Sequence, residues 1–215
     1  MKNLVLAKSL RLEIWNVLES RDGGSSEDDV MDVDKEEVEC EGPKMECVLE
    51  IPTRGRIVTL TSYSPPFGSL DYILYTTERK HYAIIGFNPK SKEVETKASG
   101  SLSESVGREK KGEPLCIVDP QANMVIFHFY DGFLKIMPLC PRAGIIRDAD
   151  AFNVRLAEDS ALSMTFLGGS SSNGDGRNFE NKELPVIAML YLDPDENFRL
   201  TTYAINLGTN RSQYY

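Results

Sequence analysis

The fold is decided by residues 114–139, which read PLCIVDPQANMVIFHFYDGFLKIMPL. The apolar runs 125–129 and 133–136 are too short for helices and are rich in β-branched and aromatic residues. An Asp131-Gly132 pair, of the kind that closes tight hairpins, separates them. Neither run alternates cleanly between apolar and polar residues, so both faces of this predicted β-meander should be covered. A sandwich core and the stacked sheets of a β-propeller both meet that condition.

The same plan recurs along the chain. Three further copies, each with two apolar runs joined by a polar turn, lie at residues 4–18, 70–87 and 185–207. Single strands are expected between the copies, at residues 56–63, 152–156 and 162–167. A hairpin with flanking strands gives about four strands per unit, which is typical of a propeller blade.

We therefore predict an all-β fold, a partial and open β-propeller built of four-stranded antiparallel blades. The blades are expected near residues 3–51, 55–98 and 114–156, with another beginning near residue 161. Because closed propellers typically carry about 4–8 blades, residues 1–215 are interpreted as part of a larger propeller or as a truncated product that something else completes. The alternative is a single β-sandwich. Packing between blades should bury the bulky side chains of Trp15, Phe87, Phe127, Phe129, Phe133, Phe166 and Tyr203.

An acidic segment interrupts the first blade. Residues 19–41 contain eleven acidic and two basic side chains, so their net charge of −9 equals that of the whole chain. The segment has too little apolar surface to offset the entropy of ordering. We predict a disordered acidic insertion over residues 19–46.

The charge distribution argues against direct binding of nucleic acid. Outside residues 19–41 the chain carries 22 basic and 22 acidic side chains, whereas a protein that holds phosphates needs a Lys/Arg surplus. Arg108, Lys110 and Lys111 form one small basic cluster. We interpret it as a solvated loop made flexible by Gly107 and Gly112.

No catalytic or cofactor-binding residue is predicted. The sequence contains no nucleophile elbow, phosphate-binding glycine loop or metal-binding helix. His128 stands alone on an apolar strand and is interpreted as a structural residue, while Asp119 and Asp131 lie in turns, where aspartate accepts backbone hydrogen bonds. The sequence does not identify the residues that contact partners.

Cysteine usage indicates a reducing compartment, and the apolar runs are too short to span a membrane. Cys40, Cys47, Cys116 and Cys140 form no CxxC pair, which gives neither a zinc motif nor a disulfide framework. No apolar run approaches the roughly 20 residues that a membrane-spanning helix needs. We expect no metal, no cofactor and no membrane association, and a location in the nucleus or cytoplasm.

The chain contains an ordered series of motifs. They are NLVLAKSLRLEIW at residues 3–15, Val106-Gly107-Arg108, IVDP at 117–120, YDG followed by FLKIMPL at 130–139, and AFNVRL at 151–156. In order and spacing this series resembles a known family, the large subunit of the damaged-DNA-binding complex, to which the large subunits of the splicing and pre-mRNA cleavage machinery are similar.

The resemblance implies the N-terminal propeller of a three-propeller adaptor. Such an adaptor performs no chemistry and links substrate receptors to a cullin-RING ubiquitin ligase in nuclear DNA repair. It implies other proteins as partners, nucleic acid only indirectly through them, and no small-molecule substrate. In this family the cullin docks on the second propeller and the receptors between the first and third. The alternatives are a propeller subunit of a splicing or pre-mRNA cleavage complex and, less consistent with the motifs, a propeller hydrolase.

Several features depart from the family pattern. The opening blade lacks the strand that normally precedes it, and Glu109 stands where the family usually has proline. Residues 208–215 (GTNRSQYY) do not continue the pattern and are interpreted as a divergent tail. These departures imply a divergent or incomplete copy.

Overall fold

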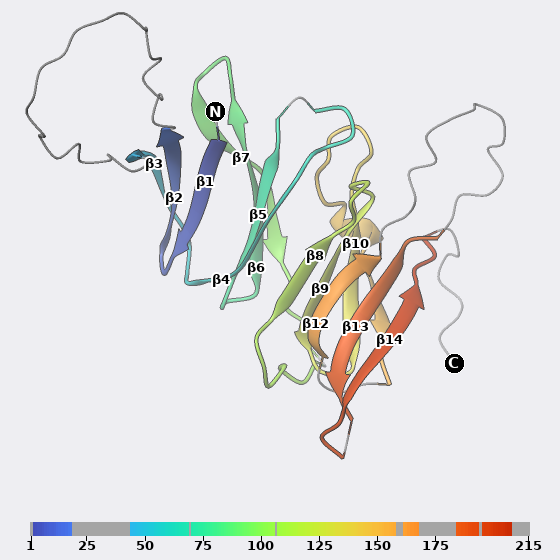
Figure 1. The fold of residues 1–215 in the computed structure, drawn as a ribbon. Coiled ribbons are helices and arrows are strands. Elements are labelled where there is room, and N and C mark those ends of the chain that lie inside the picture. The colour runs from blue at the N-terminus through green and yellow to red at the C-terminus, as the bar shows by residue number, and fades with distance from the viewer. Residues whose placement is uncertain are drawn as a thin grey trace, which may run out of the picture. The chain divides into compact units, whose positions relative to one another are not determined.

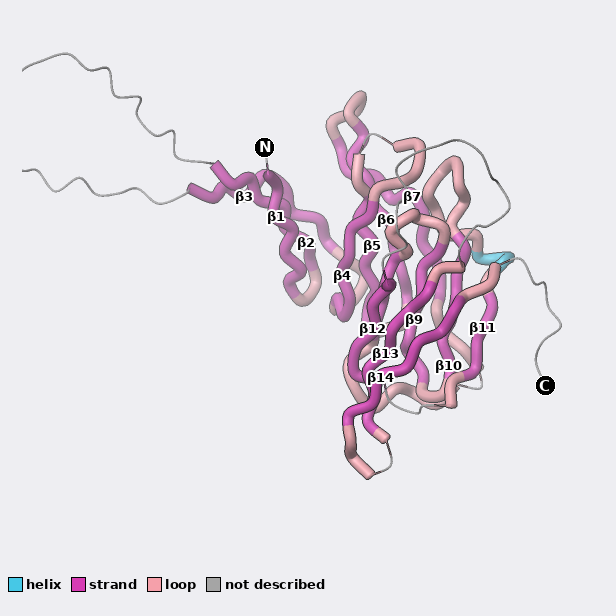
Figure 2. Tube along the Cα trace, turned by 45° about the vertical axis from the view of Figure 1, so that its right-hand side comes forward, coloured by secondary structure: helices cyan, strands magenta, loops and turns pink. Residues whose placement is uncertain are grey.

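The computed structural model describes residues 2–18, 44–68, 70–105, 107–157, 161–167, 184–193 and 195–207. These residues form antiparallel sheets and one short 3-10 helix (Figures 1 and 2). The chain divides into two compact units, Met1–Ile57 and Val58–Tyr215, and each is described by itself.

The first unit contains the sheet β1-β2-β3, made of Lys2–Lys8, Arg11–Leu18 and Lys44–Pro52. Its β1–β2 hairpin confirms the shorter copy predicted at residues 4–18. The predicted acidic insertion at 19–46 lies outside the described residues as far as residue 43. Its last three residues, 44–46, belong to β3, where Met45 and Glu46 pair with Val17 and Asn16.

The second unit begins with the four-stranded sheet β4-β5-β6-β7. Its strands are Ile57–Tyr63, Tyr72–Thr77, His81–Asn88 and Glu93–Ser101. The β5–β6 hairpin turns at the predicted charged residues, where Lys80 has a φ of 58° and donates its N–H to the Thr77 carbonyl at 2.8 Å. The sheet confirms the blade expected near residues 55–98.

The next sheet, β11-β10-β9-β8, is the predicted meander. Its strands are Leu115–Val118, Met124–Tyr130, Phe133–Pro138 and Phe152–Arg155, with the 3-10 helix η1 at Asp148–Asp150. Gly132 has a φ of 80°, which explains the glycine in the β9–β10 turn. All seven residues of β9 are buried, as the lack of apolar and polar alternation predicted.

The last sheet, β12-β13-β14, has three strands in the described part of the chain. These are Ala161–Leu167, Val186–Leu192 and Phe198–Ala204. Asp193 closes the β13–β14 turn, because its Oδ1 accepts the N–H groups of Asp195 at 3.0 Å and Asn197 at 2.9 Å. The predicted tail at residues 208–215 lies outside the described residues.

Two apolar clusters join the three sheets of the second unit. Between β4–β7 and β8–β11, the buried side chains include Leu74, Tyr82, Ile84, Val125, Phe127, Phe129 and Met137. Between β8–β11 and β12–β14, they include Met124, Ile126, Leu134, Ile136, Met164, Ile187 and Met189. Alternate residues of β9 thus enter different clusters, because successive side chains of a strand point to opposite faces.

The middle sheet therefore carries a sheet on each of its faces. A single sandwich would leave one face of each sheet to solvent, so that alternative is wrong for the second unit. The arrangement is the face-to-face stacking of propeller blades, left open in the described residues. Among the bulky residues expected in the core, the prediction for Phe87 is wrong, because its side chain is 45% exposed on β6.

Candidate interaction surface

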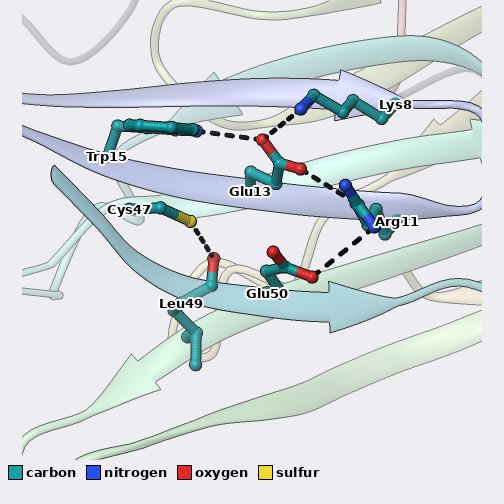
Figure 3. A network of polar contacts seen from close by, with 7 residues as sticks. All are labelled: Lys8, Arg11, Glu13, Trp15, Cys47, Leu49 and Glu50. Carbon is teal, nitrogen blue, oxygen red and sulfur yellow. Dashed lines mark hydrogen bonds and ion pairs between the residues drawn. The ribbon is translucent and has the colours of Figure 1, made fainter. Parts of the chain in front are cut away.

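A closed polar network lies on one face of the β1–β3 sheet (Figure 3). Arg11, Glu13 and Trp15 alternate along β2 and so share that face. The Glu13 carboxylate accepts hydrogen bonds from Arg11 Nε at 2.8 Å and Trp15 Nε1 at 3.1 Å, and Lys8 Nζ lies 2.8 Å from its Oε2. The Lys8 hydrogen bond lowers the pKa of Glu13, although burial opposes this. Glu13 is therefore ionised, and its carboxylate is enclosed by neighbouring residues of the same sheet. We conclude that Glu13 has a structural role.

Polar contacts also join the β4–β7 sheet to the segments around the β8–β11 sheet. The Tyr63 hydroxyl donates to the Gly144 carbonyl at 2.5 Å, and the Tyr82 hydroxyl donates to Asp148 Oδ1 at 2.7 Å. Burial raises the pKa of both tyrosines, so their hydroxyls keep their protons. Hydrogen bonds are directional, so these two contacts fix the orientation of the packed sheets and stiffen the pair.

His128 occupies the environment of a structural residue. Its side chain is fully buried on the β9 face that carries Met124 and Ile126, and Nδ1 lies 3.2 Å from the Phe133 carbonyl oxygen. Burial lowers the pKa of His128, which keeps the ring neutral and Nδ1 a donor. Nε2 is buried and has no hydrogen-bond partner among the described residues. A ring closed off from solvent in this way has no access to a substrate.

The two turn aspartates have local roles. Asp119 Oδ2 accepts hydrogen bonds from the backbone N–H of Asn123 at 3.1 Å and from its Nδ2 at 2.6 Å. Asp131 Oδ2 lies 3.6 Å from Arg108 Nε, and the Asp131 backbone N–H donates to the Arg108 carbonyl at 2.9 Å. Both carboxylates thus hold the turns in which they lie.

The basic cluster is exposed at Arg108 and Lys111, as expected of a solvated loop, and backbone contacts tie its first residues to β9. The Lys110 backbone N–H donates to the Phe129 carbonyl at 3.1 Å, and Glu109 forms a β-bridge with Tyr130. Gly107 lies so close to the Tyr130 ring that a Cβ would overlap it, so this glycine serves close approach. The Lys110 ammonium donates to the carbonyl of Glu113, which leaves this cation engaged by its own loop.

The described cysteines are free thiols with no shared site. Cys116 is partly buried against the first apolar cluster, and burial raises the pKa of its thiol to about 12. Cys47 Sγ lies 3.8 Å from the Leu49 carbonyl oxygen (Figure 3). Among the described residues, no three His, Cys, Asp or Glu side chains come together as a metal site. The described part of the chain also holds no helix of the length and hydropathy that crossing a bilayer requires.

The surface best suited to binding is the outer face of the β12–β14 sheet. The inner face of this sheet packs on β8–β11 through Met164, Ile187 and Met189. Strand alternation and the pairing register of the strands assign the outer face to Ser163, Thr165, Leu167, Val186, Ala188, Leu190, Leu192, Phe198, Leu200, Thr202 and Ala204. None of these eleven positions is charged, and Phe198 and Leu200 are 71% and 70% exposed. Leu167 and Leu192 are also exposed, whereas Ala188 is buried, and exposed apolar side chains gathered in this way mark interaction sites.

The edge of the same sheet is also open. In the two four-stranded sheets the third strand has a neighbour on each side, whereas β14 pairs with β13 alone among the described residues. An unpaired edge strand presents backbone N–H and C=O groups that another strand can bind. Its sequence, FRLTTYA, contains no proline and no glycine to weaken such pairing.

Sequence reasoning left the binding residues unknown and missed this face. The signal was present, since the run at residues 186–192 (VIAMLYL) is apolar at positions of both parities. The turn at Asp193 sets the register of the β13–β14 hairpin. That register determines which alternate residues of β14 share a face with those of β13. What the run could not indicate is which of the two faces a neighbouring sheet covers.

Comparisons with known proteins give a consistent result. A family model described as "RSE1/DDB1/CPSF1 first beta-propeller" matches residues 1–214. "DNA damage-binding protein 1b" of Arabidopsis thaliana is 28% identical over 205 residues, which cover 95% of this chain and 15% of that protein. "DNA damage-binding protein 1a" of the same plant is 31% identical, and "DNA damage-binding protein 1" of Solanum lycopersicum is 29% identical. Each of these two matches extends over 160 residues, 74% of this chain and 13% of the relative. The chain thus spans a small part of the length of these curated relatives.

Proposed function

Because this chain belongs to the RSE1/DDB1/CPSF1 first-beta-propeller family, we propose that it is a non-catalytic protein-interaction scaffold. The observation that carries this proposal is the β8–β11 sheet, which is covered on both faces by neighbouring sheets. Such stacking gives a stiff body whose loops, edges and end faces are free to bind other proteins.

The environments of the titratable groups support a binding role. Glu13, His128 and Asp119 are each held by hydrogen bonds from their own neighbourhood. An enzyme needs such groups converging on a space that a substrate can enter. In the described residues each of these three groups serves the fold in its own neighbourhood.

The finer proposal is that the chain corresponds to part of an adaptor of a cullin-RING ubiquitin ligase that acts in DNA damage repair. The names of the relatives, which are DNA damage-binding proteins, support this assignment. Its partners would be other proteins, substrate receptors among them, with nucleic acid reached through those partners. The balanced charge outside residues 19–41 agrees with indirect contact to DNA. A nuclear location follows from the same reasoning, with the cytoplasm as the alternative.

The domain organisation proposed from the sequence goes with this role. Residues 1–215 are proposed as one partial N-terminal propeller, with an acidic insertion at 19–46 inside its first blade and a divergent tail at 208–215. The sheets β1–β3, β4–β7, β8–β11 and β12–β14 support the blade boundaries.

A pull-down from nuclear extract tests the function. The full-length chain is immobilised, and the captured proteins are identified by mass spectrometry. We expect DNA-repair factors and substrate receptors of ubiquitin ligases. A second bait, in which the acidic residues of 19–41 are replaced by their amides, controls for capture by charge alone.

Two other results would redirect the assignment. The family model also covers RSE1 and CPSF1, so recovery of splicing or pre-mRNA cleavage subunits would favour the alternative propeller subunit. Turnover of a substrate by the purified chain, lost on removal of one carboxylate or histidine, would contradict the scaffold proposal.

A further inference from the structure

We propose that an internal water molecule bridges His128 and Asp131, donating one hydrogen to Nε2 of the imidazole and the other to Oδ1 of the carboxylate. Both atoms are buried, and neither has a hydrogen-bond partner among the described residues. Buried polar groups of native proteins nearly always have a partner, which is either protein or ordered water. The inference is independent of the proposed scaffold role, because it concerns how the β9–β10 turn is held.

The two side chains lie close to each other at the end of β9. His128 belongs to that strand, and Asp131 follows its last residue. His128 is fully buried, and the Asp131 side chain is 2% exposed. Burial lowers the pKa of His128 and the charge of Asp131 opposes this, so the carboxylate is near enough to act on the ring. The two groups nevertheless form no direct hydrogen bond with each other.

Both orphaned atoms are hydrogen-bond acceptors. Nδ1 of His128 lies 3.2 Å from the Phe133 carbonyl oxygen, which can only accept, so Nδ1 carries the ring proton. The lowered pKa of His128, caused by burial, keeps the ring neutral and leaves Nε2 without a proton. The carboxylate oxygen of Asp131 also only accepts. Two acceptors cannot satisfy each other, so the site needs a donor.

The donors of the neighbouring segment are engaged elsewhere. This segment precedes β8 and runs antiparallel to the end of β9. There the Lys110 N–H donates to the Phe129 carbonyl at 3.1 Å, and the Lys110 ammonium donates to the Glu113 carbonyl. The Asp131 N–H donates to the Arg108 carbonyl at 2.9 Å, and Arg108 Nε lies 3.6 Å from Oδ2, the other carboxylate oxygen. The described residues thus supply no donor to Nε2 or Oδ1.

The charges at the site select a neutral donor. The Asp131 carboxylate would repel an anion. A metal cation takes several ligand atoms, and among the described residues no three His, Cys, Asp or Glu side chains come together. Lys110, whose charge adds to the effect of burial in lowering the pKa of His128, would repel a second cation. Water is neutral and carries two donors, which match the two acceptors.

The β9–β10 turn leaves space next to Asp131. A Cβ added at Gly132, the following residue, would meet no heavy atom within 4 Å. Proteins hold about one buried water per 27 residues, so a chain of 215 residues is expected to hold several. A bridging water at this place would tie the imidazole of β9 to the carboxylate that meets the segment before β8.

Two measurements on the full wild-type chain test the proposal. A crystal structure should show a water within about 2.7–3.2 Å of both Nε2 and Oδ1. Long-range ¹H–¹⁵N NMR of the histidine rings should show the Nδ1–H tautomer for His128, with the ¹⁵N signal of Nε2 shifted to that of a hydrogen-bonded acceptor.

Oxygen-17 magnetic relaxation dispersion, which counts long-lived internal waters, compares the variants. His128→Phe removes the Nε2 acceptor and should lose one long-lived water. Asp119→Asn is the matched control, because Asp119 is also a buried turn aspartate but its Oδ2 is bonded to Asn123. Its count should equal that of wild type. Circular dichroism checks that each variant folds, and if His128→Phe does not fold, the two wild-type measurements decide.

Three outcomes would overturn the proposal. The first is a crystal structure in which no single water contacts both atoms, including one with separate waters on Nε2 and Oδ1. The second is the Nε2–H tautomer, which would make the ring a donor able to bond Asp131 directly. The third is an unchanged count of long-lived waters in folded His128→Phe.

Discussion

His128 illustrates how a single buried side chain can make stability depend on pH. Burial lowers its pKa, and the charges nearest to it act in opposite directions, because Lys110 lowers the pKa and Asp131 raises it. The unfolded chain binds the histidine proton near pH 6.5, whereas the folded chain binds it only at lower pH. The stabilising contribution is therefore complete above about pH 6.5 and is lost as pH falls below that value.

The free energy of unfolding should accordingly decrease below about pH 6.5, by at most about 1.4 kcal/mol per pH unit from this one group. Urea unfolding of wild type and His128→Gln at several pH values between 8 and 5 measures it. The variant should show a flatter profile in this window. Carboxylates such as Glu13, whose pKa is lowered, lose their contribution only at more acidic pH. Equal slopes for the two proteins would show that His128 is not the titrating group.

Gly107 provides a second prediction at the residue scale. Its neighbour Tyr130 is fixed, since its ring stacks on Phe133 with 5.3 Å between centroids and its hydroxyl accepts the Glu104 N–H at 2.8 Å. A methyl group at position 107 would overlap that ring. Gly107→Ala should therefore lower the free energy of unfolding by about 1–3 kcal/mol.

Gly112→Ala is the control in the same segment. Its added Cβ would meet only Lys110 Nζ, at an ordinary 3.5 Å. Urea midpoints of the two variants give the comparison. If Gly112→Ala were as destabilising as Gly107→Ala, general loss of loop flexibility would explain both.

At the scale of the element, β9 and β14 show how the contribution of a phenylalanine side chain to stability depends on its surroundings. Phe127 on β9 is 1% exposed between two sheets, while Phe198 on β14 is 71% exposed on the outer face. Removing a fully buried aromatic ring leaves a cavity as well as losing its transfer free energy. Removing an exposed one costs little in a single folded chain.

Phe127→Ala should therefore destabilise the chain by about 3–5 kcal/mol, and Phe198→Ala by less than about 0.5 kcal/mol. Phe127→Asp and Ile136→Asp should abolish soluble expression, because each places a charge between sheets. Urea unfolding and the soluble yield of these variants are the measurements. Normal folding of both aspartate variants would contradict the placement of these side chains in the core.

Much of each element could be predicted from local pattern. The turn at Asp131-Gly132 and the charged turn before His81 mark hairpins in sequence, and both are found. The exposure of side chains was predicted less well, because it depends on whether another sheet packs against the face that carries them. Phe87 has the composition of a core residue yet lies 45% exposed, and Leu200 lies on a face that no described sheet covers. Close approaches such as that of Gly107 to Tyr130 depend on tertiary contacts that no local pattern contains.

At the scale of the whole molecule, charge is unevenly distributed along the sequence. The excess negative charge belongs to residues 19–41, whereas the outer face of β12–β14 carries no charged residue. An uncharged face of this kind can contact another protein without charge repulsion. The candidate site could be predicted from the sequence only in part. Its apolar residues could be identified, but not which face of the sheet a neighbouring sheet covers.

The order of strands in each sheet has a further consequence. Every sheet in the described residues is assembled from strands that are consecutive in the chain. Each strand therefore pairs with the strand before it or after it. Twenty-five residues separate Leu18 from Lys44, yet β2 and β3 still pair along their length. The entropy of closing a loop grows only with the logarithm of its length, by about 0.6 kcal/mol per doubling. Hairpin ends are therefore places where evolution can lengthen this chain at small cost while the strand register stays unchanged.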